Sequence, residues 1–307
     1  MSTTVVTTPA PSAPASAGAE STSLRWRSEG FVFELVSSDT DVLRQANAVF
    51  ASPRETSVNA NVSWTIGSSE TADGERWTVT RHRDPDGRMQ SEIRESRESA
   101  LLFVENEVLD FLIAHSNESI AVHCALLAKE GRGIVIVGPS LAGKTTLAIT
   151  LWRSGWTLMA DDTAFLHPLV LTASPAPRRV SARKESRVFV GDKLWNEMEQ
   201  TPSFLRTEKG LFFHPHEVDA TSPLISTPIA SIFFLARSGV SLGAAVTSRL
   251  NTAKAAVALL PYGFNLRTVS FMEGILRITS IVEAVPAYDI GRGDLSAMVQ
   301  AVEQHVG

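Results

Sequence analysis

The segment GPSLAGKT, residues 138–145, has the residue types and spacing of a loop that could bind phosphate. It fits the pattern G-x-x-x-x-G-K-[ST]. In such a loop the glycines let backbone N–H groups turn into one concavity, and the start of the following helix adds partial positive charge. The lysine reaches the terminal phosphates of a nucleotide, and the threonine hydroxyl binds Mg²⁺. The predicted nucleotide-binding residues are Gly138, Ser140, Ala142, Gly143, Lys144, Thr145 and Thr146.

Two adjacent aspartates, Asp161 and Asp162, supply the acidic groups that phosphoryl transfer needs. They follow the apolar run 156–160, and ligands in parallel α/β sheets bind at the carboxyl ends of strands. If this strand neighbours the strand before the loop, the pair faces the terminal phosphate. One carboxylate then holds Mg²⁺ and the other accepts the proton of the attacking hydroxyl. We expect Asp162 to join Thr145 at the metal and Asp161 to be the base. Because adjacent residues of an extended strand point opposite ways, both enter the site only if the chain turns there.

A strand and a helix must position these groups. Residues 134–137 form a short apolar run bounded by glycines, which is typical of a buried strand. After the loop, Leu147 and Leu151 stand four residues apart, and Gly155 is a suitable helix end. Before the loop, residues 119–137 predict two strands joined by a tight turn at residues 129–133.

The whole chain divides into a tail, a β-rich region and a larger α/β region. Residues 1–23 are mostly Ser, Thr, Ala, Pro and Gly, and they predict a disordered tail. Residues 24–98 predict a small β-rich region of antiparallel strands, because apolar and polar residues alternate at 31–38, 57–68 and 76–84. Residues 99–307 are expected to form the catalytic domain. Its predicted elements include helices at 99–115, 251–261 and 295–306, a strand at 230–236 and an irregular basic segment at 178–189.

The composition excludes several classes of protein. The 307 residues are 44% hydrophobic and 20% charged, which is ordinary for a globular protein. A net charge of −5 argues against nucleic-acid binding through bulk charge. No window approaches the ~20 apolar residues of a membrane span, and no secretory leader is evident. The single cysteine, Cys124, weakly favours a reducing compartment. We expect a cytoplasmic protein with no nucleic-acid or membrane partner.

Residues 119–163 resemble the core of the HPr kinase/phosphorylase catalytic domain. They contain a histidine near a strand start, a short hairpin, the glycine loop, a helix ending in Gly and then Asp-Asp. The resemblance implies a P-loop-containing α/β fold with a mixed sheet, related to phosphoenolpyruvate carboxykinase. It also implies that ATP-Mg²⁺ donates its γ-phosphoryl group to a serine hydroxyl of a peptide or protein. Carried over by position, His123, Asp161 and Asp162 are the catalytic residues. The oligomeric state is not specified, and a homo-oligomer remains one alternative.

The sequence departs from that family at several positions. The family's loop reads SGxGKS, whereas Leu141 follows Ser140 here and Thr145 replaces the serine. Two later basic motifs of the family have only partial counterparts, at residues 208–213 and 261–267. The resemblance therefore does not carry over HPr itself as the substrate, nor the reverse phosphorylase reaction. Relatives with this trimmed core occur beside gene clusters for ribosomal peptides, where some look like serine kinases of precursor peptides.

Two functions of different classes fit these residues. The first is an ATP-Mg²⁺-dependent kinase that acts on a serine or similar hydroxyl. The second is a nucleotide-binding regulatory or scaffold protein that transfers no phosphate, and a small-molecule kinase lies between the two. The Asp-Asp pair favours a kinase, since a pure binder needs only one metal carboxylate. The base-reading motif of GTPases, Asn-Lys-x-Asp, is absent from the sequence, which favours ATP.

Overall fold

The computed structural model of the chain describes residues 22–50, 58–72, 74–82, 90–208, 210–219, 225–235, 247–266, 270–291 and 293–306. The tail predicted for residues 1–23 lies outside the described residues except for Thr22 and Ser23, which already belong to the first strand. The described chain combines mixed sheets with several helices. The prediction of an α/β protein with a mixed sheet is therefore confirmed.

The first sheet consists of β1 Thr22–Ser28, β2 Phe31–Ser37, β3 Val62–Thr71, β4 Gly74–Arg81 and β5 Gln90–Arg94, in that spatial order among the described residues. Most neighbours are antiparallel as predicted, but β2 and β3 are parallel. A parallel pair needs a crossover, which helix α1 (Thr40–Val49) provides. The sequence prediction missed α1, although Val42, Ala46 and Val49 are buried at helical spacing.

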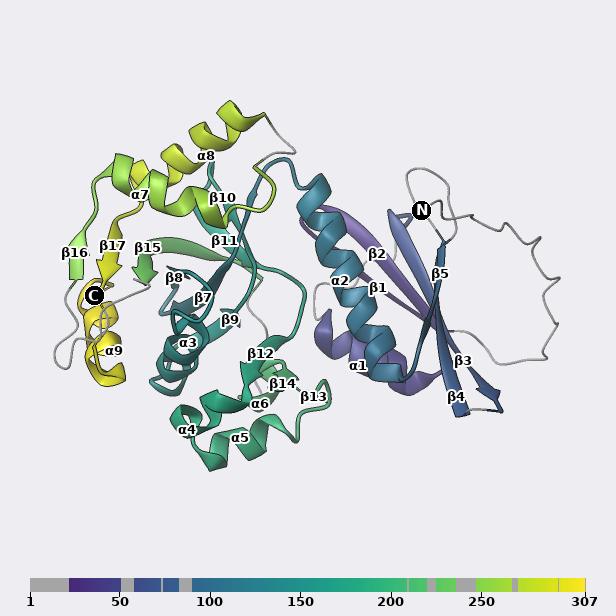
Figure 1. Cartoon of the computed structure of the whole chain (residues 1–307). Coiled ribbons are helices and arrows are strands. Elements are labelled where there is room, and N and C mark those ends of the chain that lie inside the picture. The colour runs from purple at the N-terminus through teal and green to yellow at the C-terminus, as the bar shows by residue number, and fades with distance from the viewer. Residues whose placement is uncertain are drawn as a thin grey trace, which may run out of the picture.

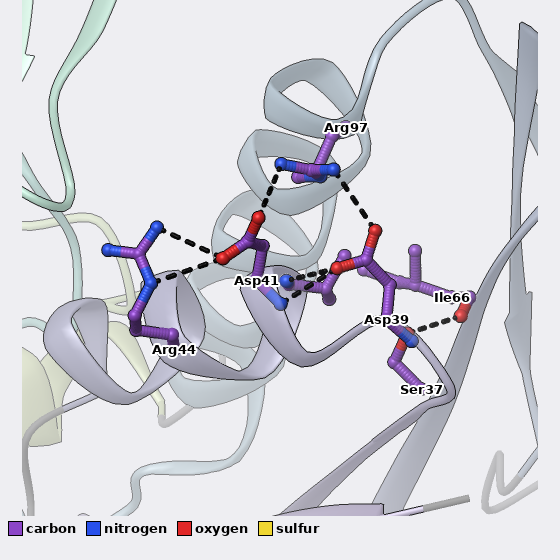
Figure 2. A network of polar contacts seen from close by, with 7 residues as sticks. Ser37, Asp39, Asp41, Arg44, Ile66 and Arg97 are labelled. Carbon is purple, nitrogen blue, oxygen red and sulfur yellow. Dashed lines mark hydrogen bonds and ion pairs between the residues drawn. The ribbon is translucent and has the colours of Figure 1, made fainter.

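A polar network fixes the start of α1 and ties it to helix α2, Arg97–His115 (Figure 2). Asp39 caps α1, because its Oδ1 accepts hydrogen bonds from two backbone N–H groups of the first turn at 2.7 and 3.1 Å. Its Oδ2 accepts a hydrogen bond from Arg97 at 3.1 Å. Asp41 pairs with both Arg44 and Arg97. The beginnings of the two helices are therefore held together by one set of charges.

Helices α1 and α2 cover one face of the first sheet (Figure 1). The alternating residues Val62, Trp64 and Ile66 of β3 are buried in the same core as residues of both helices. That core also includes Phe165 and Ala176, which follow α2 in the chain. Helix α2 thus lies between the first sheet and the rest of the protein.

The second sheet carries the predicted site. Its strands are β6 Ile120–Val122, β7 Cys124–Lys129, β8 Arg132–Val137, β9 Thr157–Ala160, β10 Ala164–His167, β11 Thr172–Pro175, β15 Thr227–Leu235, β16 Thr247–Arg249 and β17 Ala287–Ile290. Over the described ranges the order is β6-β10-β11-β15-β8-β7-β9, and β17 pairs with β15 and β16. Strands β8 and β17 are parallel to β15, whereas β7 is antiparallel to both β8 and β9.

Helices cover both faces of this sheet. They are α3 Lys144–Arg153, α7 Thr252–Leu259, α8 Phe271–Ala284 and α9 Leu295–Gln304. Along β8, Ile134 and Ile136 share a core with α3 and α9, whereas Val135 and Val137 share a core with α7 and α8. Because both faces of β8 are buried, its sequence is continuously apolar rather than alternating.

A smaller unit follows β11. It contains the sheet β12-β14-β13, formed by Val180–Arg183, Gly210–Phe213 and Leu205–Thr207, and the short helices η1 Lys184–Ser186, α4 Arg187–Val190, α5 Asp192–Met198 and α6 Pro215–Val218. The prediction of an irregular segment at 178–189 is wrong, because β12 pairs with β14 from later in the chain.

The other predicted elements are mostly found. The helices predicted at 99–115, 251–261 and 295–306 and the strand at 230–236 correspond to α2, α7 followed by η2 (Leu260–Tyr262), α9 and β15. Helix α8 was not predicted. The single strand expected before the turn at 129–133 is divided at His123, whose backbone N–H donates to the carbonyl oxygen of Tyr262 at 2.8 Å. Of the helices within the described ranges, none has both the length and the apolar character to span a membrane.

Candidate active site

Residues 138–143 join the end of β8 to the start of α3, in the predicted order of strand, loop and helix. Gly138 packs against β15: a Cβ there would lie 3.0 Å from Cβ of Leu235 and 3.1 Å from the Leu235 carbonyl oxygen. At the other end of the loop, Gly143 has a φ of 95°, which favours glycine. Both motif glycines therefore meet a backbone requirement of this connection.

Lys144 begins α3, and its side chain folds back over the loop. Its Nζ donates hydrogen bonds to the carbonyl oxygens of Gly138 at 2.7 Å and Pro139 at 3.3 Å. The residue is buried, with 7% of its surface exposed. Desolvation lowers the pKa of the Lys144 ammonium, while the charges of Asp161 and Asp162 oppose that effect. The lysine and both aspartates thus act on one another electrostatically.

Asp161 contacts the start of α3. The strand that precedes it, β9, is not a direct neighbour of β8, because β7 lies between them. Since β7 is antiparallel to both, β8 and β9 run the same way and end at the same edge of the sheet. The Thr145 hydroxyl donates a hydrogen bond of 2.8 Å to Oδ2 of Asp161. The loop and the first aspartate are therefore in direct contact.

Burial dominates the electrostatics of Asp161. Desolvation raises the pKa of its carboxyl to about 8, although the Thr145 hydrogen bond and the Lys144 charge lower it. Its Oδ1 is buried and has no hydrogen-bond partner among the described residues. Asp161 therefore offers one oxygen, inside the protein, that could still accept a proton or a cation.

Asp162 has the opposite environment. Nδ1 of His123 lies 3.2 Å from its Oδ1, and Nη1 of Arg178 lies 2.5 Å from its Oδ2. Burial raises the pKa of the Asp162 carboxyl, but the His123 hydrogen bond and the Arg178 charge outweigh it and hold the pKa below its usual value. Strand β9 ends at Ala160, so the chain bends at the doublet and the two carboxyls meet different partners.

His123 and Arg178 join the site from different elements. Nδ1 of His123 also lies 2.9 Å from the backbone carbonyl oxygen of Asp162, so this nitrogen carries the proton. His123 therefore fixes the backbone and the side chain of Asp162 together. Arg178 belongs to a basic run at residues 178–187 whose composition fits either a solvated loop or groups that stabilise a transferring phosphate or hold an acidic peptide. The ion pair with Asp162 shows that Arg178 is not part of a solvated loop, the alternative that the basic composition favoured.

The remaining predicted residues follow the loop geometry. Ser140 is exposed, whereas Ala142 is buried and its backbone N–H donates to the Pro139 carbonyl oxygen at 3.1 Å. The carbonyl oxygen of Thr146 accepts a hydrogen bond from Thr150 within α3.

The site could share a metal ion with a ligand. The Thr145 hydroxyl and the unpartnered Oδ1 of Asp161 are oxygen ligands of the kind that Mg²⁺ prefers. Within the part of the chain that is described, no group of three or more His, Cys, Asp or Glu residues could hold a metal ion by itself. Mg²⁺ usually takes one or two carboxylates and completes its shell with water and phosphate. The residues therefore fit a magnesium ion bound together with a nucleotide.

Comparisons with known proteins do not identify the function of this chain. No protein-family model matches the chain, and no curated protein matches its sequence. Among solved structures, it is similar to the HPr(Ser) kinase/phosphatase from Coxiella burnetii, with 13% sequence identity and a TM-score of 0.33 over 60% of this chain and 95% of that chain. A likeness of this size carries no argument about activity.

Proposed function

We propose that this protein is an ATP- and Mg²⁺-dependent kinase that transfers the γ-phosphoryl group to a serine or similar hydroxyl, on a peptide or protein. The observation that carries the proposal is the hydrogen bond between Thr145 and Asp161, in a site where Lys144 and both aspartates interact. A lysine, a hydroxyl and paired carboxylates beside a glycine loop are the groups that phosphoryl transfer uses.

The loop would bind the phosphates of the nucleotide. Backbone N–H groups at the start of α3 carry partial positive charge, and Lys144 adds a full charge within reach of the same loop. To reach a phosphate, Nζ of Lys144 exchanges its bonds to two loop carbonyl oxygens for bonds to phosphate oxygens. Thr145 would hold the magnesium ion together with the phosphates, and Asp162 would reach it through water. The ion supplies charge neutralisation when it is bound.

The two aspartates would divide the remaining work. Asp161 is the better proton acceptor, since a pKa near the working pH suits a general base. Both oxygens of Asp162 already have partners, His123 and Arg178. Asp162 therefore stays ionised and orders the site, and it would reach a metal ion only through water or after releasing Arg178.

In the proposed step, the acceptor hydroxyl oxygen forms a bond to the γ-phosphorus. The bond between that phosphorus and the bridging oxygen of ADP breaks, and ADP leaves with the bonding electrons. The hydroxyl proton moves to Asp161. Because the transition state is loose, the protein contributes mainly by positioning and by stabilising charge.

The test uses ATP labelled at the γ-phosphate, Mg²⁺ and a pool of short peptides with one central serine. We expect the wild-type protein to label the serine. Asp161→Asn should lower transfer by roughly 10²–10⁴-fold, the usual contribution of a general base, while MgATP binding measured by calorimetry remains. Asp192→Asn, at an exposed carboxyl on α5, is the matched control and should transfer normally.

Each other outcome has a definite meaning. Transfer by Asp161→Asn at the wild-type rate would show that the base is another group. Slow ATP hydrolysis with no labelled acceptor favours a regulatory nucleotide-binding protein, and labelling of small hydroxyl compounds alone favours a small-molecule kinase. Failure of the wild-type protein to bind MgATP contradicts the proposal altogether.

A further inference from the structure

Arg178 lies at the acidic doublet but has no task in the reaction as described above. Its Nη1 is 2.5 Å from Oδ2 of Asp162. Its positive charge also lowers the pKa of the Asp161 carboxyl, against the larger effect of burial. About a fifth of the Arg178 side chain is exposed, compared with 40% for Asp162. The guanidinium is therefore at the doublet and in reach of solvent.

The backbone beside Arg178 is held firmly from the other side. The next residue, Arg179, is buried and forms an ion pair with Glu105 of α2. Its backbone N–H also donates to Glu105, and its guanidinium donates to the carbonyl oxygen of Ser203 at 3.0 Å. On the preceding side, the N–H of Ala176 donates to the carbonyl oxygen of Thr163 at 3.1 Å. The main chain at residue 178 is thus fixed on both sides, and motion is left to the side chain.

Asp162 does not depend on Arg178 alone for a partner. His123 contacts its carboxylate at 3.2 Å and its backbone carbonyl oxygen at 2.9 Å. If Arg178 turns away, Asp162 keeps a hydrogen-bond donor. An arginine fork matches the oxygens of a phosphate as well as those of a carboxylate. An incoming phosphate could therefore replace Asp162 as the partner of Arg178.

We propose that Arg178 binds the terminal phosphate of the nucleotide, exchanging its carboxylate partner Asp162 for phosphate oxygens. This inference rests on the proposed function and deepens it, because it makes Arg178 the residue that distinguishes a nucleoside triphosphate from a diphosphate. The buried pair Glu105–Arg179 holds the segment that presents Arg178.

Calorimetric titration of the full chain with MgATP and with MgADP tests this inference. Arg178→Gln should weaken MgATP binding by roughly tenfold or more, the value of a charge-assisted hydrogen bond, and change MgADP binding much less. Retained MgADP binding shows that the variant is folded. Arg187→Gln is the matched control from the same basic segment, since Arg187 is exposed and pairs with Asp192. It should change neither affinity, and an unchanged ratio of the two affinities in Arg178→Gln overturns the inference.

A second measurement, with Arg178→Gln made in the Asp162→Asn variant, separates phosphate binding by Arg178 from neutralisation of the Asp162 charge. Removing Arg178 also leaves Asp162 without its counter-ion, which by itself repels ATP. In an Asp162→Asn background that repulsion is gone, so the loss caused by Arg178→Gln should persist if Arg178 binds phosphate. Disappearance of the loss assigns Arg178 to charge balance and overturns the inference. If the wild-type protein binds neither nucleotide, the proposed function fails as well, whereas equal losses for both nucleotides overturn only this inference.

Discussion

At the scale of residues, Asp161 and Asp162 differ because of their partners and not because of their chemistry. Asp161 is buried, with one oxygen on Thr145 and the other without a partner in the described structure. Asp162 is more exposed and contacts a guanidinium and an imidazole. Their pKa values move in opposite directions as a result. Two carboxyls with separated pKa values can divide proton transfer and charge stabilisation between them.

Asp161 also predicts a pH dependence of stability. Its pKa is about 8 in the native state against 3.8 ordinarily, so between those values the native state holds a proton that the unfolded chain has lost. Stability therefore falls as the pH rises through this window. Asp161→Asn removes the effect and should stabilise the protein more at pH 8 than at pH 5, by about 4 kcal/mol as an upper bound.

Urea unfolding of both proteins at the two pH values measures this difference. Asp192→Asn, whose carboxyl is exposed, should behave like the wild type at both. A variant at Asp161 that gains no more stability at pH 8 than at pH 5 would show that this carboxyl is ionised in the native state.

At the scale of elements, the site is made by the ends of strands and the start of one helix. Strands β8 and β9 both end at the edge where α3 begins, and β7 sets their separation. The loop is located by its contact with β15, where Gly138 lies against Leu235. The position of the loop therefore depends on a strand far along the chain.

Gly138→Ala should disturb that contact. The added Cβ would lie 3.0 Å from Cβ of Leu235 and 3.4 Å from Cβ of Ala142, so the loop or β15 must shift. Overpacking of this kind costs about 1–3 kcal/mol, and MgATP affinity should fall with it. Gly67→Ala is the control, because an added Cβ there meets nothing within 4 Å and its φ is not positive. Equal unfolding free energies for the two variants would argue against a tightly packed loop.

At the scale of the whole molecule, α2 links the first sheet to the region of the site. Its Glu105 forms the buried ion pair with Arg179, whose neighbour Arg178 contacts Asp162. A second polar contact also joins the two sheets. Glu29, between β1 and β2, accepts hydrogen bonds from Ser119 and from Ser174 of β11. Among its described residues, the β-rich N-terminal part therefore supports the site structurally without contributing a side chain to it.

Because Glu105 and Arg179 form a buried ion pair, we expect the effects of substituting them on the unfolding free energy to be strongly coupled. Removing one partner, as in Glu105→Leu or Arg179→Leu, leaves a buried charge uncompensated and should lower the unfolding free energy by about 3–5 kcal/mol. Removing both should recover most of that loss. A double-mutant cycle in urea measures the coupling, with the exposed pair Arg187–Asp192 as a control expected to couple by less than about 1 kcal/mol. Additive losses at Glu105 and Arg179 would contradict this reading.

The sequence alone determined the residues and the local elements of the site. The glycine loop, the apolar strand before it and the helix after it follow from glycine conformation and from the periodicity of burial, which act over a few residues. The same local rules identified α2 and β15. They failed at α1, although its capping residue Asp39 and its apolar spacing were present in the sequence.

Only the tertiary structure decided which groups meet. The insertion of β7 between β8 and β9, the parallel pairing of β2 and β3, and the contacts of Asp162 with Arg178 and His123 all join residues that are separated in the chain. Two neighbouring arginines with the same local pattern have different partners, since Arg178 pairs with Asp162 and Arg179 with Glu105. The partner of each is set by how the strands and helices pack, which no short stretch of sequence specifies.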